Sequence, residues 1–435
     1  MSITFLIVCT VCLLHLGSAS FVTREGSLLK LDGHVFRYGG PNIYWLGLDQ
    51  NDPPGVIAYP SKFRIDDALR TAKGMGARVL RSHTLGISTG NPLSFEPALD
   101  VWNHHALESV DYAVHRAGQL GLKLVVPLTD NYYYYHGGRH DFTDWYGLPE
   151  AEFYTNETVV AAFKRYIFHL LNHTNRYNGK RYCEDDAVMA WETGNELFPP
   201  ANWTADIAKY LKSIAPDQLV LSGRDGINIE ELGIPEVDLF SDHFYPPSAL
   251  RLEADVLLTS AASKALIVGE YGWTYNGSTH ELLKVALREV NISGALYWSL
   301  FPHLGTYGCE QHDDGFTMHY PNGGSSWREA KRREQQQFAW NMRNETEQPF
   351  LVEVAPLLHH VNVSGGSATF AWRGAAGACW YDIESGNSTV VKSNVTDDML
   401  PVVVDGVSAS GVSYHVVPYS CSGEAGPASN TVTPS

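Results

Sequence analysis

The chain has 435 residues, of which 44% are hydrophobic, and its formal net charge at pH 7 is -17. This length exceeds the usual size of one domain, so a large domain with a smaller companion is the simplest expectation. Because nucleic-acid binding depends largely on basic patches that meet phosphates, the acidic charge excludes nucleic acid as an expected ligand.

The first 20 residues predict a secretory signal peptide. An apolar run from Ile3 to Leu16 precedes Gly17-Ser18-Ala19-Ser20, whose small side chains suit signal peptidase, although the usual basic start is missing. A membrane anchor is the alternative, but the run is shorter than the ~20 residues that a bilayer requires. We expect residues 1–20 to be removed and the mature protein to be secreted and extracellular, with no membrane contact.

Glycosylation signals and cysteines agree with export. The nine Asn-x-Ser/Thr sequons, typical of secreted glycoproteins, begin at Asn156, Asn172, Asn202, Asn276, Asn291, Asn344, Asn362, Asn387 and Asn394. Beyond the signal, four cysteines remain, an even number that suits an oxidising compartment. Cys379 and Cys421 both lie in the C-terminal part and are expected to pair, whereas a bridge between Cys183 and Cys309 stays open.

Between residues 36 and 342, short apolar runs alternate with amphipathic stretches, which is typical of parallel strands joined by crossover helices. The expected strands are 36–40, 78–81, 123–128, 187–191, 219–221, 239–242, 266–268 and 295–298. The expected helices are 65–75, 104–120, 158–173, 205–213, 250–263, 279–289 and 326–342, with one more near 229–232. The pattern predicts an α/β protein, a (β/α)8 TIM barrel over residues 21–343.

The composition changes after the barrel. Residues 344–351 read as a linker, and residues 352–435 are rich in Val, Ser, Thr and Gly with period-two runs such as 368–372, so we expect a small all-β sandwich. Trp372, Tyr381, Tyr414–Tyr419 and the closing segment 426–433 resemble a fibronectin type III domain of the immunoglobulin-like class. This resemblance implies a spacer or docking module and no active site.

Two carboxylates stand where apolar strand-like runs stop. Glu196 ends the run 188–196, and Glu270 ends the run 266–270. The C-terminal ends of parallel barrel strands open onto one face, which carries the chemistry in this architecture. Glu196 and Glu270 are therefore expected to face one cleft, although a capping or salt-bridged surface glutamate is the plainer interpretation of each.

Asn195-Glu196 after one strand, Glu270 within Gly-Glu-Tyr-Gly and Trp298 after the last strand together resemble glycoside hydrolase family 5, over about residues 21–342. That resemblance implies a retaining glycosidase with Glu196 as acid/base and Glu270 as nucleophile. Asn195 can donate its amide to the sugar 2-hydroxyl, or it can simply shape a turn.

Further residues match or depart from this pattern. Arg81 can keep the nucleophile ionised, because a nearby cation lowers the pKa of a carboxylate. His83 is equally well explained as a core histidine. The family's His-x-Tyr appears as His243 and Tyr245, of which the tyrosine hydroxyl would bind the nucleophile and the imidazole would orient carboxylates.

Many relatives carry a histidine after the third strand, where this chain has Asp130 and Asn131. These two residues can bind sugar hydroxyls or form a turn.

Aromatic residues near strand ends are expected to form the groove. Trp298 offers a flat apolar face to a pyranose ring, and Tyr44 and Trp45, with Asn42, follow the first strand. The long loop after the third strand holds Tyr132–Tyr135, Trp145 and Tyr146, which we interpret as a cleft wall, with internal packing as the alternative.

No metal or cofactor is expected. After the eighth strand, His303, Cys309, His312, Asp313, Asp314 and His319 superficially resemble metal ligands. Their spacing matches no standard zinc motif, so we interpret the segment as a loop that covers substrate.

The motifs at 38–45 and 191–196 look more like the mannanases than the cellulases of the family. The leading hypothesis is a secreted, monomeric endo-acting β-1,4-mannanase whose partner is a mannan-type polysaccharide or oligosaccharide. An exo-β-mannosidase and a β-glucanase of the same family remain alternatives. A non-catalytic carbohydrate-binding protein is disfavoured, because a pure binder needs no two convergent carboxylates.

Overall fold

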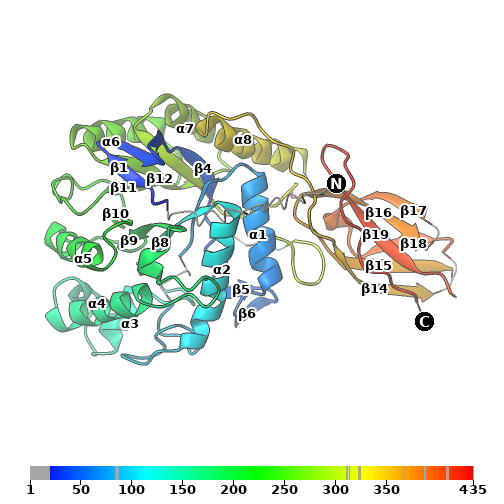
Figure 1. Cartoon of the computed structure of the whole chain (residues 1–435), viewed down its shortest axis with the longest axis horizontal. Helices are drawn as coiled ribbons and strands as arrows, with labels where there is room; N and C mark the ends of the chain where they lie inside the picture. Colours follow the sequence, from blue (N-terminus) through cyan, green and yellow to red (C-terminus); the bar gives the residue numbers. More distant parts are fainter. Residues whose placement is uncertain are drawn as a thin grey trace, which may run out of the picture.

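The computed structural model describes residues 20–83, 88–309, 312, 314–321, 325–364, 366–386, 388–407 and 411–434. The predicted signal, apart from its last residue, lies outside these ranges, as do Asp313 and Asn387. Within them, no helix is both long and apolar enough to cross a bilayer. A barrel and a pair of smaller sheets lie side by side along the chain's longest axis (Figure 1).

Eight parallel strands form the barrel, as predicted, and they adjoin one another in chain order. Their bounds are β4 Tyr38–Pro41, β7 Val79–Arg81, β8 Lys123–Pro127, β9 Val188–Glu192, β10 Leu219–Leu221, β11 Leu239–Phe244, β12 Ala265–Gly272 and β13 Ile292–Trp298. The barrel closes between β4 and β7, where the Ile43 backbone N–H donates to the Arg81 carbonyl at 2.9 Å. Side chains such as Tyr38, Val125 and Leu296 fill the interior.

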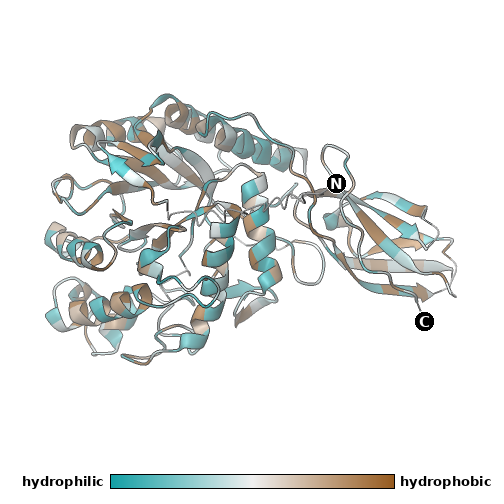
Figure 2. Cartoon of the chain, viewed as in Figure 1, coloured by the Kyte–Doolittle hydropathy of each residue, from teal (hydrophilic) through white to brown (hydrophobic). Residues whose placement is uncertain are grey.

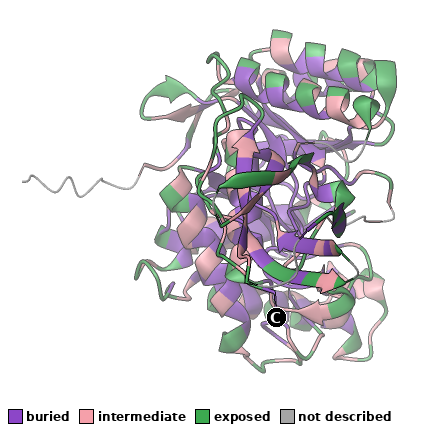
Figure 3. Ribbon diagram, turned by 90° about the vertical axis from the view of Figure 1, so that its right-hand side faces the viewer, coloured by how far each residue is buried: buried purple, intermediate pink, exposed green. Residues whose placement is uncertain are grey.

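Seven predicted helices surround these strands: α1 Lys62–Gly74, α2 Leu107–Leu120, α4 Glu157–Leu171, α5 Ala201–Ile214, α6 Ala249–Ala261, α7 Asn276–Arg288 and α8 Ser326–Met342. Each turns an apolar stripe inward and a polar face outward, so the buried residues gather at the strands (Figures 2 and 3). Helix α2 is an example of this pattern. Its buried residues include Val110, Ala113, Val114 and Ala117, and Gly121 ends the helix at a φ of 72°.

The helix predicted near 229–232 was wrong, because this segment forms consecutive turns. Glu231 explains the difference. Its buried carboxylate accepts hydrogen bonds from Ser222 at 2.6 Å and Thr204 at 3.1 Å, which tie the segment to β10 and α5. The turn is thus held by side-chain contacts that a helical period cannot reveal.

Additional elements cover the two ends of the barrel. The meander β1 Thr23–Glu25, β2 Leu28–Leu31 and β3 His34–Val35 packs under it, with Leu29 in the interior cluster. On the opposite, C-terminal face lie the hairpin β5 Asp49–Asn51 and β6 Pro54–Ala58, and the short helices α3 Arg139–Asp144 and η2 Glu150–Phe153. These pieces were not predicted.

Two three-stranded antiparallel sheets follow the barrel, as predicted. One holds β14 Leu357–Ser364, β15 Ser367–Arg373 and β18 Val402–Asp405, and the other holds β17 Thr389–Val395, β16 Ala378–Ser385 and β19 Tyr414–Ser420. They share a core that includes Trp372 and Tyr381. Cys379 and Cys421 are bonded, as expected, while Cys183 and Cys309 are free. The finer likeness to fibronectin type III, and the domain limits, stay predictions.

Candidate active site

Glu196 and Glu270 meet at the C-terminal face of the barrel. Glu196 follows β9, Glu270 lies within β12, and one carboxylate oxygen of each lies within 4.8 Å of the other. Both side chains line one cleft of about 410 Å³. The expectation that the two carboxylates face one cleft is thus met in the geometry.

A bulge at Gly269 directs Glu270 into the cleft. The pairing of β11 with β12 shifts by one residue at this point, so that Asp242 faces Val268 while His243 faces Glu270. A Cβ atom on Gly269 would lie 2.1 Å from Ser241 Oγ and 2.7 Å from His243 Nε2. Only glycine leaves room for His243 there, and bulges commonly re-aim side chains next to active sites.

Three side chains hold the carboxylate of Glu270. Arg81 Nη1 donates to Oε1 at 2.6 Å, His83 Nε2 lies 3.2 Å from Oε1, and Tyr245 Oη donates to Oε2 at 3.0 Å. Burial alone would raise the pKa of Glu270, but the charge of His243, the hydrogen bond of His83 and the charge of Arg81 outweigh it and hold the pKa well below its ordinary value. These contacts favour the ionised form of Glu270.

Arg81 is completely buried and donates hydrogen bonds to several partners. It makes a bidentate ion pair with Glu192, at 2.7 and 2.9 Å, and donates to the Asn195 amide oxygen at 2.8 Å. A buried guanidinium is tolerated only with such partners. The sequence reasoning missed Glu192. Its place in the otherwise apolar strand β9 was the available signal, since a charge buried in a strand needs a counter-ion.

Glu196 is held by two donors. Tyr132 Oη donates to Oε2 at 2.7 Å, and His243 Nδ1 lies 2.6 Å from Oε1. The backbone of Glu196 has a φ of 50°, a left-handed conformation that non-glycine residues adopt at a cost, most often at functional sites.

His243 stands between the two carboxylates. Its Nδ1, bonded to Glu196, is also 3.8 Å from Glu270 Oε2. Burial disfavours the charged imidazolium, but the charge of Glu270 and the hydrogen bond to Glu196 outweigh it and raise the pKa of His243. The imidazolium of His243 can therefore interact electrostatically with both carboxylates.

Asp130 and Asn131 lie outside the cleft wall. Asp130 is fully buried, and its oxygens accept from Asn195 Nδ2 and from His136 Nε2, each at 3.1 Å. Asn131 accepts from Arg139 at 2.9 Å. Asp130 Oδ1 also accepts from the backbone N–H of Tyr132 at 3.1 Å, as in a turn. Of the two alternatives for these residues, contact with sugar hydroxyls or a turn, the geometry matches the turn. His136, which sequence reasoning missed, does line the cleft.

The aromatic wall is formed partly as expected. Tyr44 and Trp298 stack with ring centroids 5.3 Å apart, and Trp298 Nε1 donates to Asp314 Oδ2 at 2.8 Å. Trp45, expected in the groove, is fully buried beneath Arg64 instead. Both residues lie in a turn after β4, where the alternation of a strand does not decide which side chain reaches the cleft.

Some side chains of the two long loops line the cleft, and others lie elsewhere. From the loop after β8, Tyr132, Tyr134 and Tyr135 line the cleft. Trp145 and Tyr146 instead pack against the main core.

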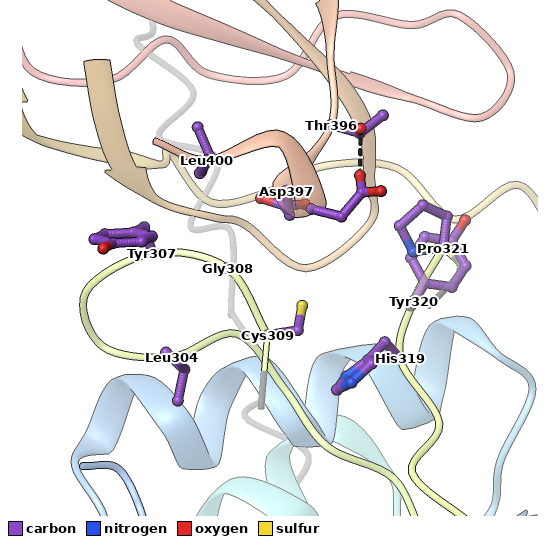
Figure 4. A pocket seen from close by; sticks show the side chains of 11 residues that line it. Leu304, Tyr307, Gly308, Cys309, His319, Tyr320, Pro321, Thr396, Asp397 and Leu400 are labelled. Carbon is purple, nitrogen blue, oxygen red and sulfur yellow. Dashed lines mark hydrogen bonds between the residues drawn. The ribbon is translucent and has the colours of Figure 1, made fainter. Parts of the chain in front are cut away.

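From the loop after β13, His312, Asp314 and Phe316 line the cleft. Cys309 and His319 line a separate pocket of about 380 Å³ at the junction with the C-terminal sheets (Figure 4).

Residues 19–246 match the family model described as GH family 5 beta-mannosidase-like, which is more than half of the 435 residues. The chain belongs to glycoside hydrolase family 5.

Curated relatives include plant and fungal proteins. Mannan endo-1,4-beta-mannosidase 1 of Arabidopsis thaliana is 28% identical over 267 residues, which cover 54% of this chain and 63% of that protein. Probable mannan endo-1,4-beta-mannosidase A of Aspergillus clavatus is 26% identical over 344 residues, 70% of this chain and 87% of that protein. The chain thus spans less than two thirds of the first relative's length.

Solved structures resemble the fold. The endo-1,4-beta-mannanase of Rhizomucor miehei gives a TM-score of 0.63 at 20% identity and covers 75% of this chain and 100% of its own. The endo-beta-1,4-mannanase of Thermotoga petrophila gives 0.61 at 20% identity and covers 92% of this chain and 99% of its own. At these identities the likeness concerns the fold alone.

Proposed function

We propose that this family 5 protein is a retaining glycoside hydrolase that cleaves internal β-1,4-mannosidic bonds of mannan-type polysaccharides. The observation that carries the proposal is the approach of the Glu196 and Glu270 carboxylates to within 4.8 Å in one cleft. Carboxyl groups stand ~5–5.5 Å apart in retaining enzymes and ~6.5–9.5 Å apart in inverting ones, which need room for a water molecule. The short spacing favours retention.

In the first step, ionised Glu270 attacks the anomeric carbon and the bond from that carbon to the leaving oxygen breaks. Glu196 gives its proton to the leaving oxygen, so the departing chain leaves as an alcohol. The donors Arg81 and Tyr245 keep Glu270 ionised and aimed before attack. The product of this step is a glycosyl ester of Glu270.

In the second step, a water molecule gives a proton to Glu196 and attacks the anomeric carbon, which releases Glu270 as a carboxylate. Glu196 ends protonated, as it began. Asn195 lines the cleft beside it, with one amide N–H given to Asp130, so its second N–H is free to donate to the sugar 2-hydroxyl.

The choice of mannose rests on the relatives. The named curated proteins are mannan endo-1,4-beta-mannosidases. The stacked pair Tyr44 and Trp298 offers an apolar platform for a pyranose ring but does not distinguish mannose from glucose, which differ at one hydroxyl. The substrate class is therefore proposed from the similarity to the named relatives, and the type of reaction from the geometry of the site.

A panel of mannan, glucomannan, cellulose and β-1,3-glucan, with sizing of the products, tests the proposal. We expect mannan to be cut and mixed oligomers to appear early, because an endo enzyme cuts within chains. Mannose as the sole early product would indicate an exo-β-mannosidase, and cleavage of glucans without mannan would indicate a β-glucanase. Binding without any cleavage would indicate a carbohydrate-binding protein.

We also propose that the protein is secreted after loss of residues 1–20. Support comes from the apolar start and the sequons. N-terminal sequencing of protein recovered from culture medium checks this proposal, and retention in cells with the first residues intact contradicts it.

A further inference from the structure

Three aromatic side chains form a row that leads out of the cleft from the nucleophile. Tyr245 follows β11, Tyr275 follows β12, and Phe316 belongs to the loop after β13. The ring centroids of Tyr245 and Phe316 lie 5.5 Å apart, and those of Phe316 and Tyr275 lie 6.0 Å apart. Tyr245 and Phe316 line the cleft, and Tyr275 lies beyond the described residues that line it. Three loops thus continue the cleft outward.

A glycine at the end of β12 makes room for the outer two rings. A Cβ atom on Gly272 would lie 2.6 Å from Tyr275 Cε2 and 2.7 Å from Phe316 Cε1. Carbon atoms in ordinary contact stay ~3.5–4.0 Å apart, so a larger residue would displace one ring or both. Both rings therefore rest on the backbone of the strand that also carries Glu270. This shared strand fixes the outer rings relative to the nucleophile.

The outermost ring is open to solvent. Tyr275 is 36% exposed, and Tyr245 at the inner end of the row is 38% exposed. Within the described ranges, no residue shares a hydrogen bond with the Tyr275 hydroxyl. A phenol offers an apolar face and a hydroxyl that can donate and accept, which suits a pyranose ring with its hydroxyl rim. One exposed tyrosine is ordinary on a protein surface, but this one continues a row that begins at the nucleophile.

We propose that Tyr275 and Phe316 form an outer subsite that binds a pyranose residue of the substrate chain beyond the sugar that reacts. This inference rests on the proposed function, since its ligand is the β-1,4-linked substrate itself. Tyr245 Oη donates to Glu270 Oε2 at 3.0 Å, which places the Tyr245 ring beside the reacting sugar. Phe316 and Tyr275 are the next two rings outward and therefore meet sugars further along the chain.

An outer subsite makes turnover depend on chain length. A chain that reaches Tyr275 gains a stacking contact that a shorter chain lacks. Binding at sugars remote from the scissile bond helps to hold the reacting sugar in place. An enzyme that cuts within long chains always has such remote sugars available, so the outer subsite accords with endo action.

The kcat/KM values for mannotetraose and mannohexaose test the subsite. In Tyr275→Ala we expect kcat/KM to fall by at least ~3-fold for mannohexaose, mainly through KM, and to fall less for mannotetraose. Tyr275→Phe keeps the ring and should retain most of the preference for the longer chain. The matched control is Phe168→Ala, which removes a 49% exposed ring of α4 and should leave both values unchanged. Circular dichroism checks that each variant is folded.

An N-glycan on the neighbouring residue is kept out of the comparison. Asn276 is exposed, follows Tyr275 and begins a sequon that ends at Ser278. The reference protein and every variant therefore carry Ser278→Ala, which removes the glycosylation signal and leaves Asn276 in place. A difference between Tyr275→Ala and the reference then belongs to the ring at position 275.

Two results would overturn the outer subsite. Equal losses for both substrates in Tyr275→Ala would show damage to the cleft itself, which acts on chains of either length. Unchanged values for both substrates would show that the ring does not meet the chain. If glucans alone are cut, cellotetraose and cellohexaose take the place of the mannose oligomers and the same two results apply.

Isothermal titration with mannohexaose and cellohexaose separates this inference from the proposed function, because the Glu270→Ala protein binds without turnover. Binding that Tyr275→Ala weakens, in a protein that cuts no polysaccharide of the panel, would contradict the proposed function alone. Cleavage of mannan with the same length preference in Tyr275→Ala would contradict the outer subsite alone. Neither binding nor cleavage would contradict both.

Discussion

At the scale of single residues, the two carboxylates have separable roles. Glu270 receives hydrogen bonds from Arg81 and Tyr245, whereas Glu196 receives them from Tyr132 and His243. The first set keeps one carboxylate ionised. The second set leaves the other partly exposed, at 16% of its side chain, where it can exchange a proton with substrate or water.

We expect Glu270→Ala to abolish turnover, because no other group can form the glycosyl ester. Glu196→Ala should lower kcat by ~10²–10⁴-fold, the usual contribution of general acid/base help. Rates are measured on mannohexaose, with Glu184→Ala, an exposed glutamate, as the control. Near-normal turnover in either active-site variant would contradict the assignment of roles.

Tyr132 provides a prediction for the pH profile. Its hydroxyl, on a half-exposed loop, donates to Glu196 Oε2 at 2.7 Å and so stabilises the ionised carboxylate. In Tyr132→Phe we expect the alkaline limb of kcat/KM to move to higher pH by roughly 0.5–1 unit, the equivalent of one hydrogen bond.

The control for this variant is Tyr133→Phe. Tyr133 is 65% exposed and stacks on His140 outside the cleft. It should keep the original pH profile. An unmoved limb in Tyr132→Phe would mean that the phenol does not influence proton transfer.

Strand-end placement was enough to predict the pair Glu196 and Glu270, because parallel strands bring their C-terminal ends together. It could not predict which neighbour points inward. Trp45 and Asp130 lie in the expected segments but face the core. The bulge at Gly269 and the left-handed backbone at Glu196 depend on tertiary contacts, so no local pattern of residues reveals them.

At the scale of elements, the barrel strands and seven helices were predicted because short continuous apolar runs alternate with amphipathic stretches of helical period. The segment near 229–232 and the pieces α3 and η2 were not, since side chains such as Glu231 stabilise them from a distance. Regular packing against a sheet leaves a period in the sequence, whereas irregular loops leave none.

Helix α6 carries a carboxyl group that limits stability. Asp255 is buried beside Asp242 of β11, and burial followed by the charge of Asp242 raises the pKa of Asp255 to about 7. The unfolded chain ionises near its ordinary pKa, ~3.9. Folding therefore loses stability as pH rises from about 4 to about 7, because the folded state holds the proton that the unfolded state has released.

Asp255→Asn cannot ionise and keeps a donor for Asp242. We expect its free energy of unfolding to exceed that of the unchanged protein by about 1–2 kcal/mol at pH 8, and to be similar at pH 4. Urea unfolding followed by tryptophan fluorescence measures the difference, with Asp217→Asn, an exposed aspartate, as the control. A difference that does not change with pH would show that packing alone is altered.

At the scale of the whole molecule, the barrel and the C-terminal sheets are joined by polar contacts around a buried histidine. His303, in the loop after β13, places Nδ1 at 2.9 Å from Asp67 of α1 and Nε2 at 3.2 Å from Asp397 of the C-terminal part. Arg70 adds an exposed pair with Glu353 across the same junction. One imidazole that bridges two carboxylates therefore contributes to the position of the C-terminal sheets.

The charge of His303 predicts how this junction responds to pH. Burial opposes the imidazolium, but Asp67 and Asp397 outweigh it and raise the pKa of His303 well above its ordinary value. Other titratable groups near it include Cys309, a neutral thiol, and Arg64, which donates to the His303 carbonyl. Tyr381 donates to the same Asp397 oxygen at 3.3 Å. A raised pKa in the folded state stabilises the fold fully below pH ~6.5, and this stability is lost as pH rises through the folded pKa.

His303→Gln can donate to only one of the two carboxylates and carries no charge. We expect it to lower the free energy of unfolding by about 2–4 kcal/mol at pH 6, because breaking a buried ion pair leaves an uncompensated charge. The deficit should be smaller at pH 9 than at pH 6, because rising pH draws the proton from the histidine of the unchanged protein and removes part of its stabilising charge. Scanning calorimetry at both pH values measures the effect and should reveal a separate transition of the C-terminal sheets at pH 6.

The control is His359→Gln, since exposed His359 contacts the Gly305 carbonyl across the same junction without a carboxylate partner. An equal deficit at pH 6 and pH 9 would mean that His303 fills space at the junction and that its charge does not hold the two parts together.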